Sequence, residues 1–217
     1  MDSCPTLDER AALSAFGLSN EALIRLMCRL WAEVFADDVD FIMHYLHTFS
    51  RRDNRILRFS AIDGSLVAMM HFHTFTAHFS TGTGTDLTGS YIYGVATAPR
   101  WRSRGIASAM LYESFKKMEL NGIDFAMLIA EEPSLREWYK NFGFELLDGI
   151  TVKLTGGDAS PAKHNLAEPI YHGMDFGTGN EYLNVPMVRK TARSGNLSCI
   201  DSEFKLRFPQ AITIPAP

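Results

Sequence analysis

The stretch VATAPRWRSRGIA, from Val95 to Ala107, decides the fold because it joins a predicted strand to the start of a predicted amphipathic helix. The first backbone N–H groups of a helix lack intrahelical partners and the helix dipole is positive there, so such a junction attracts anions. Gly105 carries no side chain to block an approaching phosphate. Three arginines, Arg100, Arg102 and Arg104, add positive charge. An ordinary solvated turn with three arginines is the alternative interpretation.

Strands and helices alternate on the C-terminal side of this stretch. Asn121-Gly122 stops the helix that begins at Ile106, and Pro133-Ser134 starts a shorter one. Helices that cross between buried strands imply a partly parallel sheet. The predicted elements are a strand over 91–97, a helix over 106–120, a strand over 125–130, a helix from 133 and a strand from 144.

Two amphipathic helices are predicted to open the fold. Apolar residues recur at three- and four-residue steps from Glu21 to Phe35, with charged residues between them. A second stripe ends at Phe49, and either Asp37 or Asp38 can cap its helix. Some aromatic residues here and in the following strands could line a substrate pocket, although core packing explains them more simply: Trp31, Phe41, Tyr45, Phe72 and Phe75.

A β-hairpin follows, with Asp63-Gly64 as the turn between strands over 56–62 and 66–75. The Gly- and Thr-rich segment 80–90 is expected to be a loop. Because the hairpin is antiparallel and the later strand pairs are parallel, the predicted fold class is α/β with a mixed sheet.

The C-terminal part of the chain carries weaker signals. No element is predicted for residues 151–181, where Gly and Pro recur. Residues 182–190 are expected to return as a last strand, at an edge of the sheet because of Pro186. We expect one domain over residues 1–192 and a loose tail over 193–217.

Composition narrows the class of protein. The chain has 217 residues, of which 46% are hydrophobic and 21% charged, as in soluble globular domains. A net charge of −4 predicts no nucleic-acid partner, and the lack of a long apolar run predicts no membrane partner. Three widely spaced cysteines suit a reducing compartment, so a cytoplasmic location is expected. The sequence does not determine the oligomeric state; a homodimer is one option.

Arg102, Gly105 and Ala107 match the pyrophosphate-binding signature of the GNAT superfamily of N-acetyltransferases: Arg or Gln, two residues, Gly, one residue, then Gly or Ala. The chain therefore resembles this family, and the flanking residues agree. Trp101 takes a position that is usually aromatic. Gly94 is a candidate bulge residue in a strand similar to the family's fourth.

A second motif lies at the distance that the family shows. The run WYKNFGFE, from Trp138 to Glu145, resembles an aromatic pair, two variable residues and an apolar-Gly-aromatic-Glu end. With the opening helices and the hairpin, the resemblance covers about residues 20–150. The segment 151–181 is longer than the family's usual connection between its last two strands.

The resemblance implies a GNAT-type acyl-CoA N-acyltransferase fold that takes acetyl-CoA as co-substrate and needs no metal. In this fold the fourth strand is bulged and splays from the fifth to admit the pantetheine arm. The implied cofactor-binding residues are Val95, Ala96, Thr97, Arg102, Ser103, Arg104, Gly105, Ile106, Ala107, Ser108 and Tyr139.

The resemblance also implies direct attack of an amine nitrogen on the thioester, with a small molecule or a peptide as acceptor. The backbone N–H of Val95 or of a neighbour would polarise the carbonyl. Tyr139 matches the tyrosine that donates a proton or a hydrogen bond to the leaving thiolate. A phenol with a pKa of ~10 is protonated at neutral pH and suits this role. Packing of Tyr139 on the core is the alternative interpretation.

An acceptor amine arrives protonated, so a base must act before the attack. Glu132 is the candidate base, beside Glu131 at the end of the predicted fifth strand. Tyr91 and Tyr93 on the fourth strand are alternatives, and a surface or structural role is the simpler explanation for any one of the four residues.

Two further sequence patterns give weaker indications of function. His71 and His73 share one face of a strand, as two metal ligands would, but no third ligand is evident, so packing or lining of the substrate side is expected. The Gly-Lys-Ser/Thr ending of a nucleotide phosphate loop is missing, which argues against a nucleotide-binding protein of that class. The alternative function is a module that holds acyl-CoA as a regulatory ligand without turnover.

Overall fold

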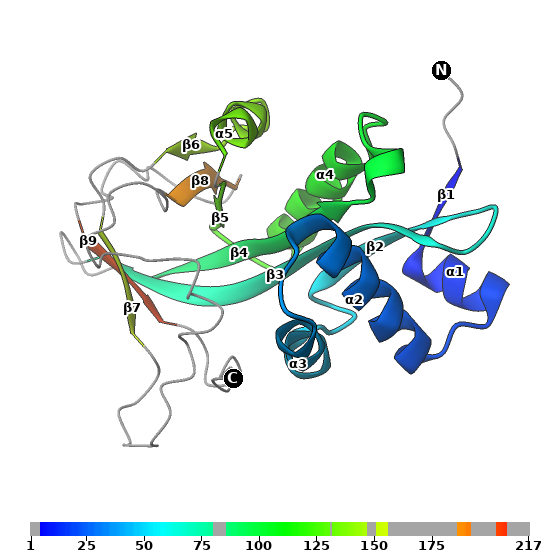
Figure 1. The fold of residues 1–217 in the computed structure, drawn as a ribbon. Coiled ribbons are helices and arrows are strands. Elements are labelled where there is room, and N and C mark those ends of the chain that lie inside the picture. The colour runs from blue at the N-terminus through cyan, green and yellow to red at the C-terminus, as the bar shows by residue number, and fades with distance from the viewer. Residues whose placement is uncertain are drawn as a thin grey trace. The chain divides into compact units, whose positions relative to one another are not determined.

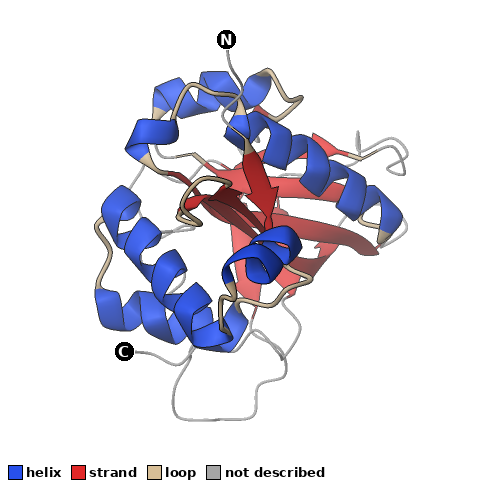
Figure 2. Cartoon of the chain, turned by 90° about the vertical axis from the view of Figure 1, so that its right-hand side faces the viewer, coloured by secondary structure: helices blue, strands red, loops and turns tan. Residues whose placement is uncertain are grey.

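The computed structural model describes residues 5–79, 86–130, 132–146, 151–155, 186–191 and 203–207. Helices and strands are interspersed along these residues, as Figure 1 shows by residue number and Figure 2 by type of element. The helices are α1 (Glu9–Phe16), α2 (Asn20–Phe35), α3 (Val39–Phe49), the 3₁₀ turn η1 (Pro99–Trp101), α4 (Ile106–Leu120) and α5 (Pro133–Lys140). The strands are β1 (Thr6–Asp8), β2 (Arg55–Ser60), β3 (Leu66–Phe79), β4 (Asp86–Thr97), β5 (Phe125–Ile129), β6 (Glu145–Leu146), β7 (Thr151–Thr155), β8 (Pro186–Lys190) and β9 (Glu203–Arg207).

The chain divides into two compact units. The first comprises Met1–Phe72 and Ile92–Ser114, and the second comprises His73–Tyr91 and Phe115–Pro217. Strands β3 and β4 and helix α4 contribute residues to both units. Within the described part of the chain, every helix is too short or too polar to cross a membrane.

The sheet of the first unit is built on the predicted hairpin. β2 pairs antiparallel with β1 and with β3, and Arg55 lies opposite His71 in the second ladder. Gly64 in the connecting turn has φ 68°, and its N–H donates to the carbonyl of Ser60 at 3.0 Å. This left-handed conformation favours glycine and confirms the Asp63-Gly64 turn.

Helices cover both faces of this sheet. Arg55 points to one face, where its guanidinium forms an ion pair with Glu9 of α1 at 2.6 Å. Arg58 is three residues further along β2, so its side chain points to the opposite face, where it pairs with Glu113 of α4. His71 lies on the Arg55 face and contacts the rings of Trp31 and Tyr45, from α2 and α3.

The two predicted amphipathic helices are confirmed, and the structure selects the cap of the second. Ser19 caps α2 and Asp38 caps α3, because each side chain accepts hydrogen bonds from N–H groups of the first turn. Asp37 instead accepts a hydrogen bond from the indole of Trp31 at 2.7 Å. The prediction that these helices open the fold is wrong, since β1 and α1 precede them, with Asp8 as the cap of α1.

The sheet of the second unit is mixed, as predicted. β4 and β5 pair in parallel over Gly89–Tyr91 and Phe125–Met127, and β8 pairs antiparallel with both β5 and β6. The end of β3 pairs antiparallel with β9, which itself pairs in parallel with β7. Parallel and antiparallel ladders therefore occur in one unit, which supports the α/β class with a mixed sheet.

The expected loop over 80–90 is wrong from Asp86 onward, because β4 begins there; residues 80–85 lie outside the described part. Gly89 explains the error. A Cβ on Gly89 would stand 2.3 Å from the ring of Phe75 and 2.7 Å from that of Phe125. This glycine lets two aromatic rings pack against a strand, whereas the sequence suggested a flexible turn.

The position expected for the last strand is also wrong. β8 lies between β5 and β6 and not at an edge of the sheet. Pro186 is tolerated because it is the first residue of the strand, where a missing N–H does least harm to the ladder.

Two strands occupy segments in which none was predicted. β7 lies in the stretch expected to be loop, and β9 lies in the stretch expected to be a loose tail. Both sequences, TVKLT and EFKLR, alternate apolar and polar residues, the signal of a strand that the glycines and prolines nearby outweighed. The domain boundary at residue 192 stays a prediction.

Candidate functional site

The turn between β4 and α4 is anchored on the first unit. The N–H of Ala98 donates to the carbonyl of Val67 in β3 at 2.9 Å, and the N–H of Trp101 donates to Ala98 at 2.8 Å. Pro99 starts η1, where its lack of an N–H costs nothing. Trp101 is buried, with 7% of its surface exposed. Its packing therefore fixes the position of the first residue of the loop that follows.

The loop over 102–105 has an unusual backbone and an open surface. Ser103 has φ 59° and Gly105 has φ 75°, so two residues of this short loop adopt the left-handed conformation. Apart from the two neighbouring residues in the chain, no residue has an atom within 4 Å of the place where a Cβ of Gly105 would stand. A ligand can therefore approach the main chain at this glycine without displacing protein atoms.

The N-terminus of α4 continues directly from this loop. The N–H of Ala109 donates to the carbonyl of Gly105 at 2.9 Å, which is the first bond of the helix. The N–H groups of residues 105–108 thus have no partner within the helix, and the first turn contains no acidic residue. This geometry suits an anion such as a diphosphate.

The three arginines are all exposed and are held in different ways. Arg102 donates from Nε to the carbonyl of Thr97 at 3.2 Å. Arg100 donates to the hydroxyl of Ser65 at 3.2 Å and lies 4.0 Å from a carboxylate oxygen of Asp63. The guanidinium of Arg104 lies over the ring of Trp101, 5.1 Å from its centre.

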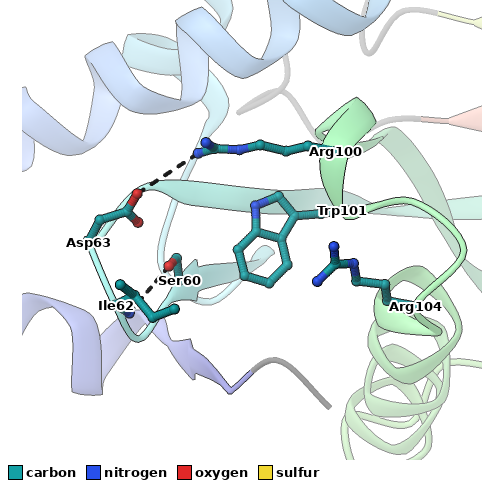
Figure 3. Close-up of a pocket in the computed structure, with 6 residues that line it drawn as sticks. All are labelled: Ser60, Ile62, Asp63, Arg100, Trp101 and Arg104. Atoms are coloured by element: carbon teal, nitrogen blue, oxygen red, sulfur yellow. Dashed lines mark hydrogen bonds and ion pairs between the residues drawn. The ribbon is translucent and has the colours of Figure 1, made fainter. Parts of the chain in front are cut away.

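Arg100 and Arg104 line a surface recess together with Trp101 and the hairpin turn (Figure 3). The sequence did not predict this recess, because it identified Asp63 only as a residue of the hairpin turn. Hydrogen bonds from Ser65 and Ser60 lower the pKa of Asp63 to about 2, so this carboxylate is ionised at neutral pH. The complete lining is Ser60, Ile62, Asp63, Arg100, Trp101 and Arg104.

The candidate bulge residue, Gly94, interrupts the regular course of β4. Its φ is 59°, and it lies three residues beyond Tyr91, the last residue of β4 in the parallel ladder with β5. A Cβ on Gly94 would stand 3.1 Å from the ring of Trp31. Both the conformation and the space at this position therefore favour glycine.

The ring of Trp31 beside Gly94 belongs to a cluster of rings from α2, α3 and β4 in the first unit. Tyr93 is half-buried, and its ring lies 5.4 Å from Trp31 and 5.4 Å from Tyr45. Among the aromatic residues that were candidates for a substrate pocket, Phe41 is half-buried. The other four belong to the core, which favours core packing over a pocket: Trp31, Tyr45, Phe72 and Phe75.

The two histidines are buried within separate units. The Nε2 atom of His71 lies 3.0 Å from the hydroxyl of Ser50, which in turn accepts a hydrogen bond from Arg55. Burial lowers the pKa of His73 to about 4, so this side chain is neutral at physiological pH. The burial of both histidines is consistent with the expected packing role.

The second motif explains how α5 ends in the second unit. Gly143 has φ 80°, and its N–H donates to Lys140 at 3.0 Å, which closes the helix. Phe144 then enters the core, with 1% of its surface exposed, and Arg189 donates to the carbonyl of Phe142 at 2.9 Å. The apolar-Gly-aromatic pattern is therefore a helix stop followed by a core residue.

Tyr139 lies on the inner side of α5. Only 7% of its surface is exposed, and its ring lies 5.7 Å from that of Phe144. Burial raises the pKa of the Tyr139 phenol above its ordinary value. Glu132, just before α5, is exposed, and its carboxylate accepts a hydrogen bond from Ser134 at 3.3 Å. Glu131 lies outside the described residues.

The predicted cofactor-binding residues from Val95 to Ser108 all lie in the first unit, along the end of β4, the exposed loop and the first turn of α4. Tyr139 and Glu132 lie in the second unit. A family model described as "Acetyltransferase (GNAT) domain" matches residues 18–147. The chain belongs to the GNAT family.

Solved structures similar to this chain include other GNAT proteins. YhbS of Escherichia coli, a GNAT family N-acetyltransferase in complex with CoA, is 14% identical, with a TM-score of 0.54 over 87% of this chain and 85% of that one. A GCN5-related N-acetyltransferase from Anabaena variabilis is 15% identical, with a TM-score of 0.51 over 65% of this chain. Eis1 from Mycobacterium abscessus is 15% identical, with a TM-score of 0.46 over 69% of this chain.

The match spans 32% of the length of the Anabaena protein and 32% of that of Eis1. At these identities the YhbS and Anabaena structures show the GNAT fold alone. A search of curated protein sequences returned no match.

Proposed function

We propose that this GNAT protein transfers the acetyl group of acetyl-CoA to a primary amine, by direct attack of the amine nitrogen on the thioester. One observation carries the proposal: a glycine at φ 75° with open space beside it stands at the start of α4, among three exposed arginines. Main-chain N–H groups of residues 105–108 are the donors that a diphosphate needs there. The exposed arginines add the positive charge that attracts the polyanion.

The end of β4 supplies the second part of the proposal. A backbone N–H at or near Val95 would donate to the thioester oxygen as negative charge develops on it during the attack. Gly94 sets the direction of that N–H because its left-handed conformation turns the strand just before Val95.

Tyr139 is the proposed donor to the leaving thiolate. Its raised pKa keeps the phenol protonated throughout the physiological range. Because this pKa exceeds that of a thiol, ~8.5, complete proton transfer to sulfur is uphill. Tyr139 therefore acts as a hydrogen-bond donor that stabilises the thiolate.

Glu132 is the proposed base for the acceptor amine. Its carboxylate is exposed and solvated, which suits removal of a proton through water. The hydrogen bond from Ser134 orients the carboxylate at the start of α5. The acceptor itself, a small molecule or a peptide, is part of the proposal, as is a cytoplasmic location.

The test is an assay for free thiol with acetyl-CoA and a broad panel of primary amines. We expect thiol release that depends on the amine, together with acetylated amine in the products. Tight cofactor binding without acetylation of any amine would instead establish the regulatory acyl-CoA-binding module. The burial of Tyr139 against Phe144 is the observation that favours this second function, because packing alone accounts for it.

A further inference from the structure

We infer that Arg189 of β8 is a positioning residue for Tyr139, because it holds the turn that ends α5 and supports the phenol ring. The inference rests on the proposed function, in which Tyr139 donates to the leaving thiolate. Strand β8 lies beside α5 (Figure 1), and both belong to the second unit. Arg189 is distant from Tyr139 in the sequence, and neither motif of the family includes it.

The guanidinium of Arg189 is held by an aromatic ring and by main-chain oxygens. It lies over the ring of Phe115 from α4, with its central carbon 3.9 Å from the ring centre. Its Nε atom donates to the carbonyl of Phe142 at 2.9 Å, and Nη1 donates to the carbonyl of Lys190 at 3.3 Å. A planar guanidinium with a ring on one face and acceptors at its edge keeps one orientation. Arg189 is therefore a rigid support for the carbonyl of Phe142.

The turn that Arg189 holds contacts Tyr139 in two ways. The N–H groups of Phe142 and Phe144 both donate to the carbonyl of Tyr139, at 2.9 Å and 3.4 Å. The ring of Phe144 lies 5.7 Å from that of Tyr139, in an edge-to-face arrangement. Gly143 brings the turn close to the arginine, since a Cβ there would stand 3.7 Å from the Nε atom of Arg189. A shift of this turn would therefore move both the main chain and the ring of Tyr139.

Helix α5 depends on such a support because it is short. It has eight residues, about two turns, which is too few for a stable helix without tertiary contacts. Glu132 makes no side-chain hydrogen bond to the first turn, whereas Arg136 ties the start of the helix to the carbonyl of Ala130 at 2.8 Å. Arg189 has the corresponding role at the end of the helix. Because a displacement of about 1 Å at a reacting group can lower a rate about a hundredfold, both anchors bear on the action of the Tyr139 phenol.

The experiment is a double-mutant cycle on kcat, measured as thiol release from acetyl-CoA by the full chain with its best amine. Arg189→Gln should lower kcat about threefold to tenfold and no more than Tyr139→Phe does, because a positioning residue cannot cost more than the group it positions. In the Tyr139→Phe background the same substitution should change kcat by about twofold or less, since the phenol is already absent. Coenzyme A affinity should stay unchanged in all three variants. Equal losses from Arg189→Gln in the two backgrounds would overturn the inference and leave the proposed function standing.

Two further variants separate positioning from loss of charge or of packing. Lys190→Gln is the matched control, because Lys190 is the next residue of β8, is exposed and points to the opposite face of the sheet, so kcat should not change. Arg189→Met keeps the packing on Phe115 but has no donor for Phe142. It should lose as much kcat as Arg189→Gln, and it takes the place of that variant in the cycle if Arg189→Gln does not fold. Full kcat in Arg189→Met, or an equal loss in Lys190→Gln, would overturn the inference.

Amide hydrogen exchange tests the same contact without turnover. The N–H groups of Phe142 and Phe144 should exchange about fivefold to tenfold faster in Arg189→Gln, the effect expected from loss of one hydrogen bond. The N–H groups of Asn121 and Gly122, which close α4 in the same unit, should exchange at an unchanged rate. Unchanged exchange at Phe142 and Phe144 would overturn the inference whatever the activity. If the unsubstituted protein releases no thiol with any amine, the proposed function fails, and the inference fails with it.

Discussion

The loop before α4 and the inner side of α5 carry the two sequence motifs of the family in opposite surroundings. The loop over 102–105 is exposed, positively charged and left-handed at two residues. Tyr139 on α5 is buried against Phe144, and burial raises its pKa. A polyanion reaches the loop directly from water, whereas the phenol can act only on a group that has left water. The loop is therefore the proposed binding region and α5 the proposed catalytic region. Substitutions in the loop should change coenzyme A affinity, and substitution of Tyr139 should change kcat.

The largest expected effect is on binding at the loop. Gly105→Val should weaken coenzyme A binding about a thousandfold, because a branched side chain would cover the amides and the left-handed φ would be strained, at a loss of at least two charge-assisted hydrogen bonds. Calorimetric titration measures this change.

Gly17→Ala is the control for backbone strain. Gly17 has φ 60° and, like Gly105, has no atom beyond its two chain neighbours within 4 Å of the place where a Cβ would stand. Gly17→Ala should lower stability by about 1–2 kcal/mol and leave coenzyme A affinity unchanged. Equal loss of affinity in the two variants would show that strain, and not blocked amides, weakens binding.

The second effect concerns a buried titratable group of the second unit. The pKa of His73 is lowered from 6.5 to about 4, so the unfolded chain binds a proton at mildly acid pH that the folded chain does not. The free energy of unfolding should therefore fall by about 3 kcal/mol as the pH falls from 6.5 to 4. Above pH 6.5 this contribution is fully present.

Urea unfolding at a series of pH values, for the unsubstituted protein and for His73→Gln, measures the effect. In the variant, the free energy of unfolding should depend less on pH between 6.5 and 4. The same slope in the unsubstituted protein and the His73→Gln variant would rule out His73 as its source.

The third effect tests Tyr139. Tyr139→Phe should lower kcat about tenfold to a hundredfold and leave coenzyme A affinity unchanged, because the phenol is proposed to stabilise only the leaving thiolate. Tyr112→Phe, at an exposed tyrosine of α4, is the control and should leave kcat unchanged. Unchanged kcat in Tyr139→Phe would leave Tyr139 as a core residue.

The smallest effect is expected at the bulge. Gly94→Ala should lower the free energy of unfolding by about 1–2 kcal/mol, because φ is 59° and the new Cβ would stand 3.1 Å from Trp31. Thermal unfolding should show a decrease in Tm of several degrees. A Tm equal to that of the unsubstituted protein would mean that β4 does not require glycine here.

The sequence predicted those features that depend on local chemistry. The turn at Gly64, an aspartate cap at residue 37 or 38 and the helix that starts at Ile106 each follow from residue types whose preferences act over a few positions. The turn at Gly105 could be predicted for the same reason, since a glycine and three arginines before an amphipathic stripe have a local physical meaning.

The features that were missed depend on residues distant in the sequence. Gly89 lies in β4 because the rings of Phe75 and Phe125 pack against it, which no local pattern reveals. Pro186 begins a central strand because β5 and β6 both pair with β8. The recess beside Arg104 requires the hairpin turn at Asp63, about 40 residues earlier, and only the folded chain brings the two together.

The most direct test of the account is amide hydrogen exchange across residues 103–108, with and without coenzyme A. We expect coenzyme A to slow exchange of these amides, because they are the proposed donors to its diphosphate. Binding of coenzyme A with no change in exchange at these residues would contradict it.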